Sequence, residues 1–142
     1  KGLKFAKLYK IPFCILNLNK IISFEYLLKE LQKRNISIIC LAGYMKILNK
    51  KFINKFNKII INIHPSLLPK YKGLGAFEKV LKNKEKLTGC TVHYVNNKLD
   101  SGKIILQKKI CVESNDSIQT LKAKVQTKEY RAYSESIISI YR

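Results

Sequence analysis

The sequence has no long apolar run, because Lys, Asn or Asp interrupts each hydrophobic stretch. A membrane-spanning helix needs roughly 18 or more consecutive apolar residues, so the sequence excludes one. The first ten residues also lack the apolar segment and cleavage site of a secretory signal peptide. We therefore expect a cytoplasmic protein, and its 142 residues suffice for a single domain over 1–142 with a buried core.

Paired cysteines are also missing. Cys14, Cys40, Cys90 and Cys111 stand far apart without a C-x-x-C pair, and three of them lie in apolar runs. This spacing disfavours a zinc site or a disulfide framework. It favours small core side chains in a reducing compartment, and no motif predicts a bound metal.

Arginine is scarce, with only Arg34, Arg131 and Arg142, although lysine raises the net charge to +19. The lysines are scattered along the chain, and no basic tract alternates with aromatic residues as in many proteins that bind nucleic acid. The charge is therefore more typical of a solvated surface than of a nucleic-acid site. A basic binding module is kept as a hypothesis of a different class.

Short apolar runs alternate with segments of helical periodicity, which is typical of an α/β fold. Strands are predicted over residues 11–16, 36–43, 58–63, 88–95 and 103–112. Helices are predicted over 3–9, after a cap at Ser23, after Asn49, over 76–84 and from Asp116, with Gln119 completing a capping box. We expect a Rossmann-like open sheet, mainly parallel with helices on both faces, whose last two strands pair as a hairpin.

The strand over 58–63 ends in I-N-I-H-P-S-L-L-P, which places Asn62 and His64 two residues apart. In extended backbone their side chains leave on the same face. Ligands of open α/β sheets bind beyond the carboxyl ends of parallel strands, where these residues lie. An amide N–H and an imidazole N–H directed at one point can bind a developing oxyanion, although a lone histidine is more often structural.

Asp100 supports the catalytic interpretation. It lies in N-N-K-L-D-S-G, a polar loop between two predicted strands that return to the same edge of the sheet. A carboxylate near His64 would fix its tautomer and favour the charged imidazolium.

Four segments together carry a resemblance to a known family: L-A-G-Y-M-K-I-L, I-N-I-H-P-S-L-L-P-K-Y-K-G-L, T-V-H-Y-V-N-N-K-L-D-S-G and V-Q-T-K-E-Y. In this order and spacing the chain resembles phosphoribosylglycinamide formyltransferase, the folate-dependent enzyme of purine synthesis. The resemblance implies the formyltransferase fold and assigns Asn62, His64 and Asp100 as the catalytic residues. It also implies transfer of a formyl group from 10-formyltetrahydrofolate, a co-substrate, to glycinamide ribonucleotide, by a monomer or homodimer without a metal.

The same resemblance implies two binding sites. The folate site would comprise Lys20, Met45, Lys46, Ile47, Leu48, Asn62, Asn96, Asn97, Lys98, Leu99 and Asp100. Gln126 and Glu129 would contact the nucleotide substrate. From the residues alone, Y-M-K-I-L is equally typical of ordinary packing at a strand-to-helix junction, and Gln126 and Glu129 are more typical of a solvated helix face. His93 is expected to support the site.

The family opens with a strand and a glycine-rich phosphate loop, and no such segment occurs here. Since the chain also begins without methionine, we expect a fragment that lacks this first strand and loop. Alternative relatives are formyltetrahydrofolate hydrolase, which Pro65 disfavours because the hydrolase typically has a second histidine there, and methionyl-tRNA formyltransferase. A catalytically inactive fragment is a further alternative.

Overall fold

The structure is a computed structural model that describes residues 2–16 and 21–142. The chain divides into two compact units, Lys1–Ile36 and Ser37–Arg142. Whether these units form the single predicted domain stays a prediction. Among the described residues, none of the helices is long and apolar enough to cross a bilayer.

The first unit contains two helices, α1 (Gly2–Leu8) and α2 (Ile21–Lys33). The strand predicted over residues 11–16 is wrong, because this segment has no regular secondary structure. The amide of Ile11 bonds instead to the carbonyl of Ala6, at the end of α1. The predicted cap at Ser23 is also wrong, since α2 begins two residues earlier and one serine inside a helix costs little.

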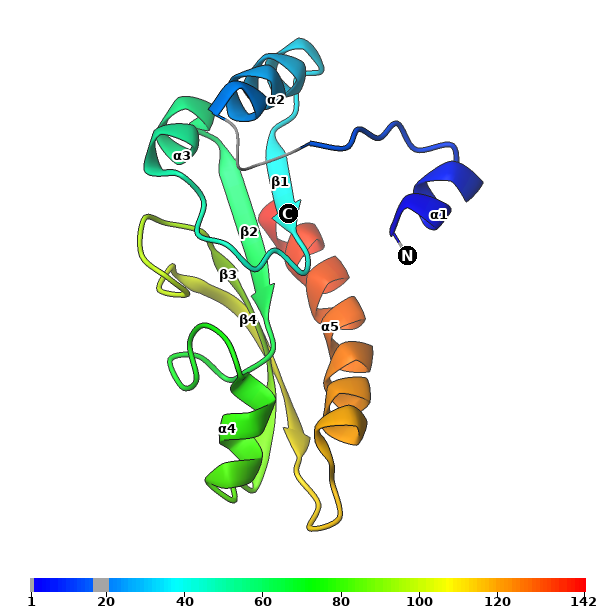
Figure 1. Ribbon diagram of the computed structural model, residues 1–142, viewed down its shortest axis with the longest axis vertical. Coiled ribbons are helices and arrows are strands. Elements are labelled where there is room, and N and C mark those ends of the chain that lie inside the picture. Colours follow the sequence, from blue (N-terminus) through cyan, green and yellow to red (C-terminus); the bar gives the residue numbers. More distant parts are fainter. Residues whose placement is uncertain (1, 17–20) are drawn as a thin grey trace. The chain divides into compact units, whose positions relative to one another are not determined.

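The second unit is built on a four-stranded sheet in the order β1-β2-β3-β4 (Figure 1). Its strands are β1 (Ile38–Leu41), β2 (Ile59–His64), β3 (Leu87–Tyr94) and β4 (Ile104–Cys111). The β1 and β2 strands are parallel, whereas β3 is antiparallel to both β2 and β4. The predicted hairpin is confirmed, but the prediction of a mainly parallel sheet is wrong. The sheet of the described residues is mixed because the hairpin lies beside β2 in antiparallel orientation.

The long helix α5 (Ile118–Ile140) packs against β3 and β4 (Figure 1). Apolar residues from β2, β3 and α5 meet in the core between them: Ile61, Cys90, Val92, Val125 and Ala132. Each of these five is completely buried, so the sheet and α5 share one core.

The predicted helix caps at Asn49 and Asp116 are confirmed in part. Asn49 caps α3 (Lys50–Phe56) by accepting from the amide of Lys51, as predicted. The predicted cap of α5 is displaced by one residue, because Ser117 and Thr120 form the capping box instead of Asp116 and Gln119. The carboxylate of Asp116 bonds instead to the backbone, to Thr120 and to Lys124.

The prediction that the cysteines are core residues is wrong for three of the four. All four are free, but only Cys90 is buried, whereas Cys14, Cys40 and Cys111 are exposed. Burial, followed by the nearby charge of Glu129, raises the pKa of the Cys90 thiol to about 11. Cys90 is therefore an unreactive core residue, and the other three are surface residues.

The segment after β2 is anchored to the sheet by Thr91. Its buried hydroxyl donates to the carbonyl of Ser66 at 2.6 Å and accepts from the amide of Leu68 at 3.0 Å. Gln107 on β4 donates to the same hydroxyl at 2.8 Å and to the carbonyl of Leu68 at 2.9 Å. These bonds fix the chain that leaves β2 just beyond His64.

The Thr91 network gives a stability prediction. Thr91→Val should lower the free energy of unfolding by about 1 to 3 kcal/mol, because it leaves buried backbone groups without partners. The matched control is Thr88→Val on the same strand, since the buried hydroxyl of Thr88 has no hydrogen-bond partner among the described residues. Urea unfolding of the two variants measures the difference, and an equal effect of both substitutions would contradict this account of the loop.

Candidate active site

The candidate site lies at the end of β2, where Asn62 and His64 are placed on one face by their two-residue spacing. Asn62 stands opposite His93 on β3, and His64 stands opposite Thr91. His64 and His93 are both buried. The pairing of β2 with β3 therefore brings both histidines of the chain into one polar cluster.

His64 has an acceptor oxygen at each ring nitrogen. Its Nε2 lies 2.8 Å from the carbonyl oxygen of Tyr71, and its Nδ1 lies 3.3 Å from Oδ2 of Asp100. A neutral imidazole carries only one N–H and could donate to only one of them. The hydrogen bond to Tyr71 places a proton on Nε2, and the carboxylate of Asp100 lies within ion-pair distance of Nδ1, where it would stabilise a second proton on the ring.

Asp100 reaches His64 from the loop between β3 and β4. Its own φ is 43° and that of Gly73 is 73°, so both backbones turn through the left-handed region. The amide of Gly73 donates to Oδ2 of Asp100 at 2.8 Å, and Lys72 donates to the hydroxyl of Ser101 at 2.6 Å. The two loops on either side of the site are therefore tied to each other, and the predicted proximity of Asp100 to His64 is confirmed.

His93 is a neutral partner of Asn62. Its Nδ1 donates to the carbonyl of Tyr94 at 2.8 Å, which leaves a lone pair on Nε2. Burial lowers the pKa of His93, although Tyr94 and Asp100 act in the opposite direction. Because the ring is uncharged at neutral pH, its approach to Asp100 is not an ion pair. Nε2 instead accepts from the amide of Asn62 at 3.4 Å.

The bond to His93 orients the side chain of Asn62. One N–H of the amide points to His93, so the nitrogen faces the cluster and a second N–H is left for another acceptor. An amide donor and an imidazole that lies between a carbonyl oxygen and a carboxylate thus stand at one strand end. This is the kind of environment that stabilises an oxygen on which negative charge develops.

Most of the predicted folate residues lie in two loops, over 45–48 and 96–100. Met45, Lys46 and Ile47 are exposed and only Leu48 is buried, so these residues do not form a closed apolar pocket by themselves. On the other loop, residues 96–99 are exposed, and the amide of Lys98 donates to Asn96 in a local turn. Lys20 lies outside the described residues.

The two predicted nucleotide contacts lie on α5. Gln126 is exposed and Glu129 is half-buried. Burial raises the pKa of the Glu129 carboxyl, while Lys122 acts in the opposite direction. A partly desolvated carboxylate beside the sheet is suited to accept hydrogen bonds, but its role stays a prediction.

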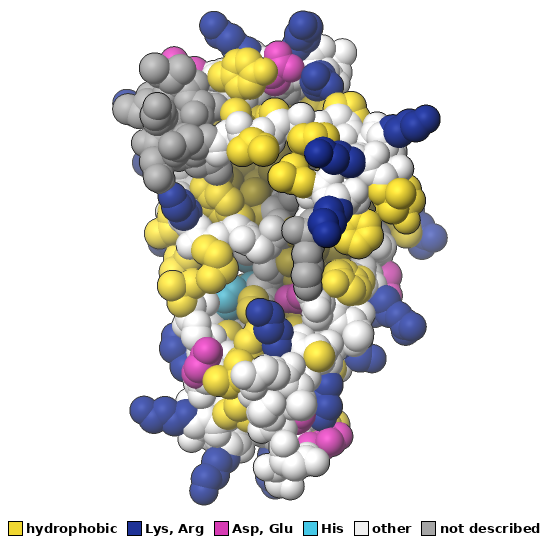
Figure 2. Space-filling view, turned by 45° about the vertical axis from the view of Figure 1, so that its right-hand side comes forward, with side chains coloured by type: hydrophobic (Ala, Val, Ile, Leu, Met, Phe, Trp, Pro, Cys, Tyr) yellow, Lys and Arg dark blue, Asp and Glu magenta, His cyan; other side chains and the backbone are white. Residues whose placement is uncertain are grey.

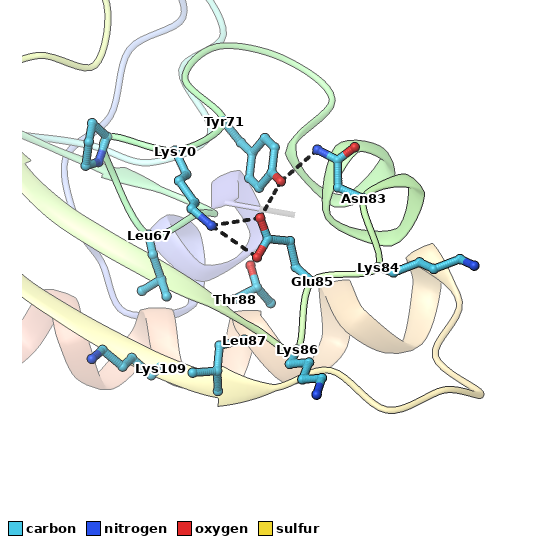
Figure 3. Close-up of a pocket in the computed structure, with 11 residues that line it drawn as sticks. Leu67, Lys70, Tyr71, Asn83, Lys84, Glu85, Lys86, Leu87, Thr88 and Lys109 are labelled. Carbon is cyan, nitrogen blue, oxygen red and sulfur yellow. Dashed lines mark hydrogen bonds and ion pairs between the residues drawn. The ribbon is translucent and has the colours of Figure 1, made fainter.

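A cavity of about 630 Å³ lies next to the site, and Asn62, His64 and Asp100 are not among its lining residues (Figure 3). Leu67, Tyr71, Glu85, Thr88 and Lys109 are among the residues that line it. Tyr71 also contacts His64, through its carbonyl oxygen. Local sequence patterns did not indicate Tyr71, because its role depends on backbone geometry and not on a motif.

The described residues show neither a basic patch on the face in Figure 2 nor a cluster of metal ligands. Lysine and arginine side chains are dispersed over the face seen in Figure 2 and do not gather in one patch. No group of three or more His, Cys, Asp or Glu side chains in the described part of the chain could hold a metal ion.

Comparison with known proteins identifies the family. Residues 6–137 match the family described as formyl transferase, so the chain belongs to the formyl transferase family. Within it, the chain is similar to phosphoribosylglycinamide formyltransferase of Haemophilus influenzae, with 45% identity over 103 residues that cover 72% of this chain and 49% of that protein. It is also 42% identical over 107 residues to the human trifunctional purine biosynthetic protein adenosine-3, covering 75% of this chain and 11% of that protein.

Solved structures of phosphoribosylglycinamide formyltransferases share the fold. The structure from Brucella melitensis has a TM-score of 0.90 and 35% identity, covering 98% of this chain and 73% of that one. The structure from Anaplasma phagocytophilum has a TM-score of 0.88 and 39% identity, covering 96% of this chain and 66% of that one. The chain thus spans only part of these relatives, and about half of the curated Haemophilus influenzae protein.

The approach of Asp100 to His64 requires glycine at position 102. A Cβ atom on Gly102 would lie 1.6 Å from the carbonyl oxygen of Tyr94, so Gly102→Ala must displace the loop that carries Asp100. We expect a lower free energy of unfolding and altered ring-proton signals of His64 in NMR spectra. Gly2→Ala is the matched control, because a Cβ there meets nothing within 4 Å. Unchanged His64 signals in Gly102→Ala would contradict the proposed coupling.

Proposed function

We propose that this chain carries the catalytic site of a phosphoribosylglycinamide formyltransferase, which transfers the formyl group of 10-formyltetrahydrofolate to the amine of glycinamide ribonucleotide. The observation that carries the proposal is the pair of acceptor contacts on His64, from Tyr71 and from Asp100. They favour a charged imidazole beside the amide of Asn62 at a strand end. The family and its similar members agree with this chemistry.

The reaction follows from these groups. The amine of the nucleotide attacks the formyl carbon, and the carbonyl electron pair moves onto the formyl oxygen as the tetrahedral intermediate forms. The second N–H of Asn62 donates to that oxygen, and the charge of His64 stabilises it. Asp100 keeps the imidazole charged and, through water, accepts the proton that leaves the amine. Collapse of the intermediate breaks the bond to the folate nitrogen, which leaves with its electron pair and takes up the proton that came from the amine, and the formyl group stays on the product.

The substrates would lie on opposite sides of this centre. We assign the folate to the loops that contain Met45 to Leu48 and Asn96 to Asp100, which offer apolar side chains and backbone polar groups where strands end. The nucleotide would contact Gln126 and Glu129 on α5, where the carboxylate can accept from ribose hydroxyls. The free cysteines agree with a reducing compartment such as the cytoplasm.

Formyl transfer by the 142-residue chain tests this function. Asn62→Ala and His64→Ala should each reduce the rate by about 10²- to 10³-fold, because each removes a group that stabilises the oxyanion. Production of tetrahydrofolate from 10-formyltetrahydrofolate in the presence of glycinamide ribonucleotide measures the rate.

The control for this prediction is Asn54→Ala, which changes an exposed asparagine on α3 and should leave the rate unchanged. Isothermal titration with each substrate separates lost binding from lost chemistry. Transfer at the wild-type rate in both site variants would refute the assignment. Retention on heparin or DNA without any formyl transfer would instead support a basic binding module.

A further inference from the structure

Tyr71 connects the cavity wall to His64. Its carbonyl oxygen accepts from Nε2 of His64 at 2.8 Å, whereas its side chain lines the cavity. Figure 3 shows the Tyr71 hydroxyl directed at the carboxylate of Glu85, and the amide of Asn83 directed at that hydroxyl. One residue therefore links the imidazole to polar groups that do not contact it.

The side-chain anchor of Tyr71 is fully hydrogen bonded. Its hydroxyl donates to Oε1 of Glu85 at 2.6 Å and accepts from Nδ2 of Asn83 at 2.8 Å. Lys70 donates to both oxygens of Glu85, at 2.8 and 3.1 Å. Hydrogen bonds from Lys70 and then Tyr71 lower the pKa of the Glu85 carboxyl, so it is a charged acceptor at neutral pH. Lys70, Tyr71, Asn83 and Glu85 form what we call the Tyr71 anchor.

The backbone of Tyr71 needs such an anchor. Its φ is 56°, in the left-handed region that a bulky non-glycine residue rarely adopts. Residues in this region persist only when surrounding contacts hold them there. In this unfavourable backbone conformation, the carbonyl oxygen of Tyr71 faces Nε2 of His64.

Other titratable and charged groups of the cluster also surround the His64 ring. Asp100 lies at Nδ1, the neutral ring of His93 lies beyond it, and the positive charge of Lys72 acts on the same cluster. Without the Tyr71 acceptor, a neutral ring could satisfy Asp100 with a single N–H and could rotate more freely. The carbonyl therefore contributes to both the orientation and the charge of the imidazole.

We propose that the Tyr71 anchor is a positioning device for His64. By fixing the Tyr71 carbonyl on Nε2, it holds the imidazole oriented and doubly protonated for transfer of the formyl group. The effect on turnover rests on the proposed function, whereas the effect on the ring does not.

Tyr71→Phe tests the proposal by removing only the hydroxyl. The turnover number should fall about 10- to 100-fold because the imidazole is misplaced, while the KM for both substrates changes by less than about twofold. The ring ¹⁵N chemical shifts of His64 should move towards those of a neutral imidazole. His64→Gln assigns the signals, since the chain has only two histidines.

Graded variants distinguish positioning from a general loss of structure. Glu85→Gln keeps an acceptor oxygen for the Tyr71 hydroxyl and should impair turnover less than Glu85→Ala. Asn83→Ala should cause a smaller change in the same direction and serves if Tyr71→Phe folds poorly. The control is Lys86→Ala, because Lys86 lines the same cavity but points away from the anchor in Figure 3.

The outcomes separate the two proposals. If Tyr71→Phe leaves the His64 ring signals and the turnover at wild-type values, the positioning role is wrong. If the wild-type chain transfers no formyl group, the proposed function fails, and the ring signals alone decide about the anchor. Altered ring signals in Lys86→Ala of the size seen in Tyr71→Phe would also overturn the proposal.

Discussion

The contact between the carboxylate of Asp100 and the imidazole of His64 is the interaction on which the candidate site depends. It joins residues 36 positions apart, one at the end of β2 and the other in the loop between β3 and β4. The contact requires that loop to turn back over the sheet, which the left-handed backbone of Asp100 and the close approach of Gly102 to Tyr94 allow. The amide of Gly73 then holds the carboxylate in place.

The two histidines of the cluster have different hydrogen-bonding neighbours. His93 is buried with a carbonyl at one nitrogen and an amide donor at the other, which suits a neutral ring. His64 faces acceptors at both nitrogens, which suits an imidazolium. His93 accepts from Asn62, whereas His64 lies between Tyr71 and Asp100, so the register and the loops give the two rings different partners.

Sequence patterns predicted the local part of this arrangement and missed the tertiary part. The spacing of Asn62 and His64 and the turn-rich loop of Asp100 predicted that these side chains meet at the end of β2. They could do so because strand periodicity and loop composition are local properties of the sequence. The pairing of His93 with Asn62 depends on the register of β2 and β3, which no local pattern specifies. The contact of Tyr71 depends on a single backbone angle, and the antiparallel position of β3 made the sheet mixed where alternation had suggested a mainly parallel one.

The rate of formyl transfer in Asp100→Asn tests the central claim most directly. Asparagine keeps the size of the side chain and an oxygen for the amide of Gly73, but it removes the negative charge that faces His64. If this charge maintains the imidazolium, the rate should fall by about 10²-fold or more. A rate within about threefold of the wild type, which is far less than the loss expected when a charge partner is removed, would contradict the account.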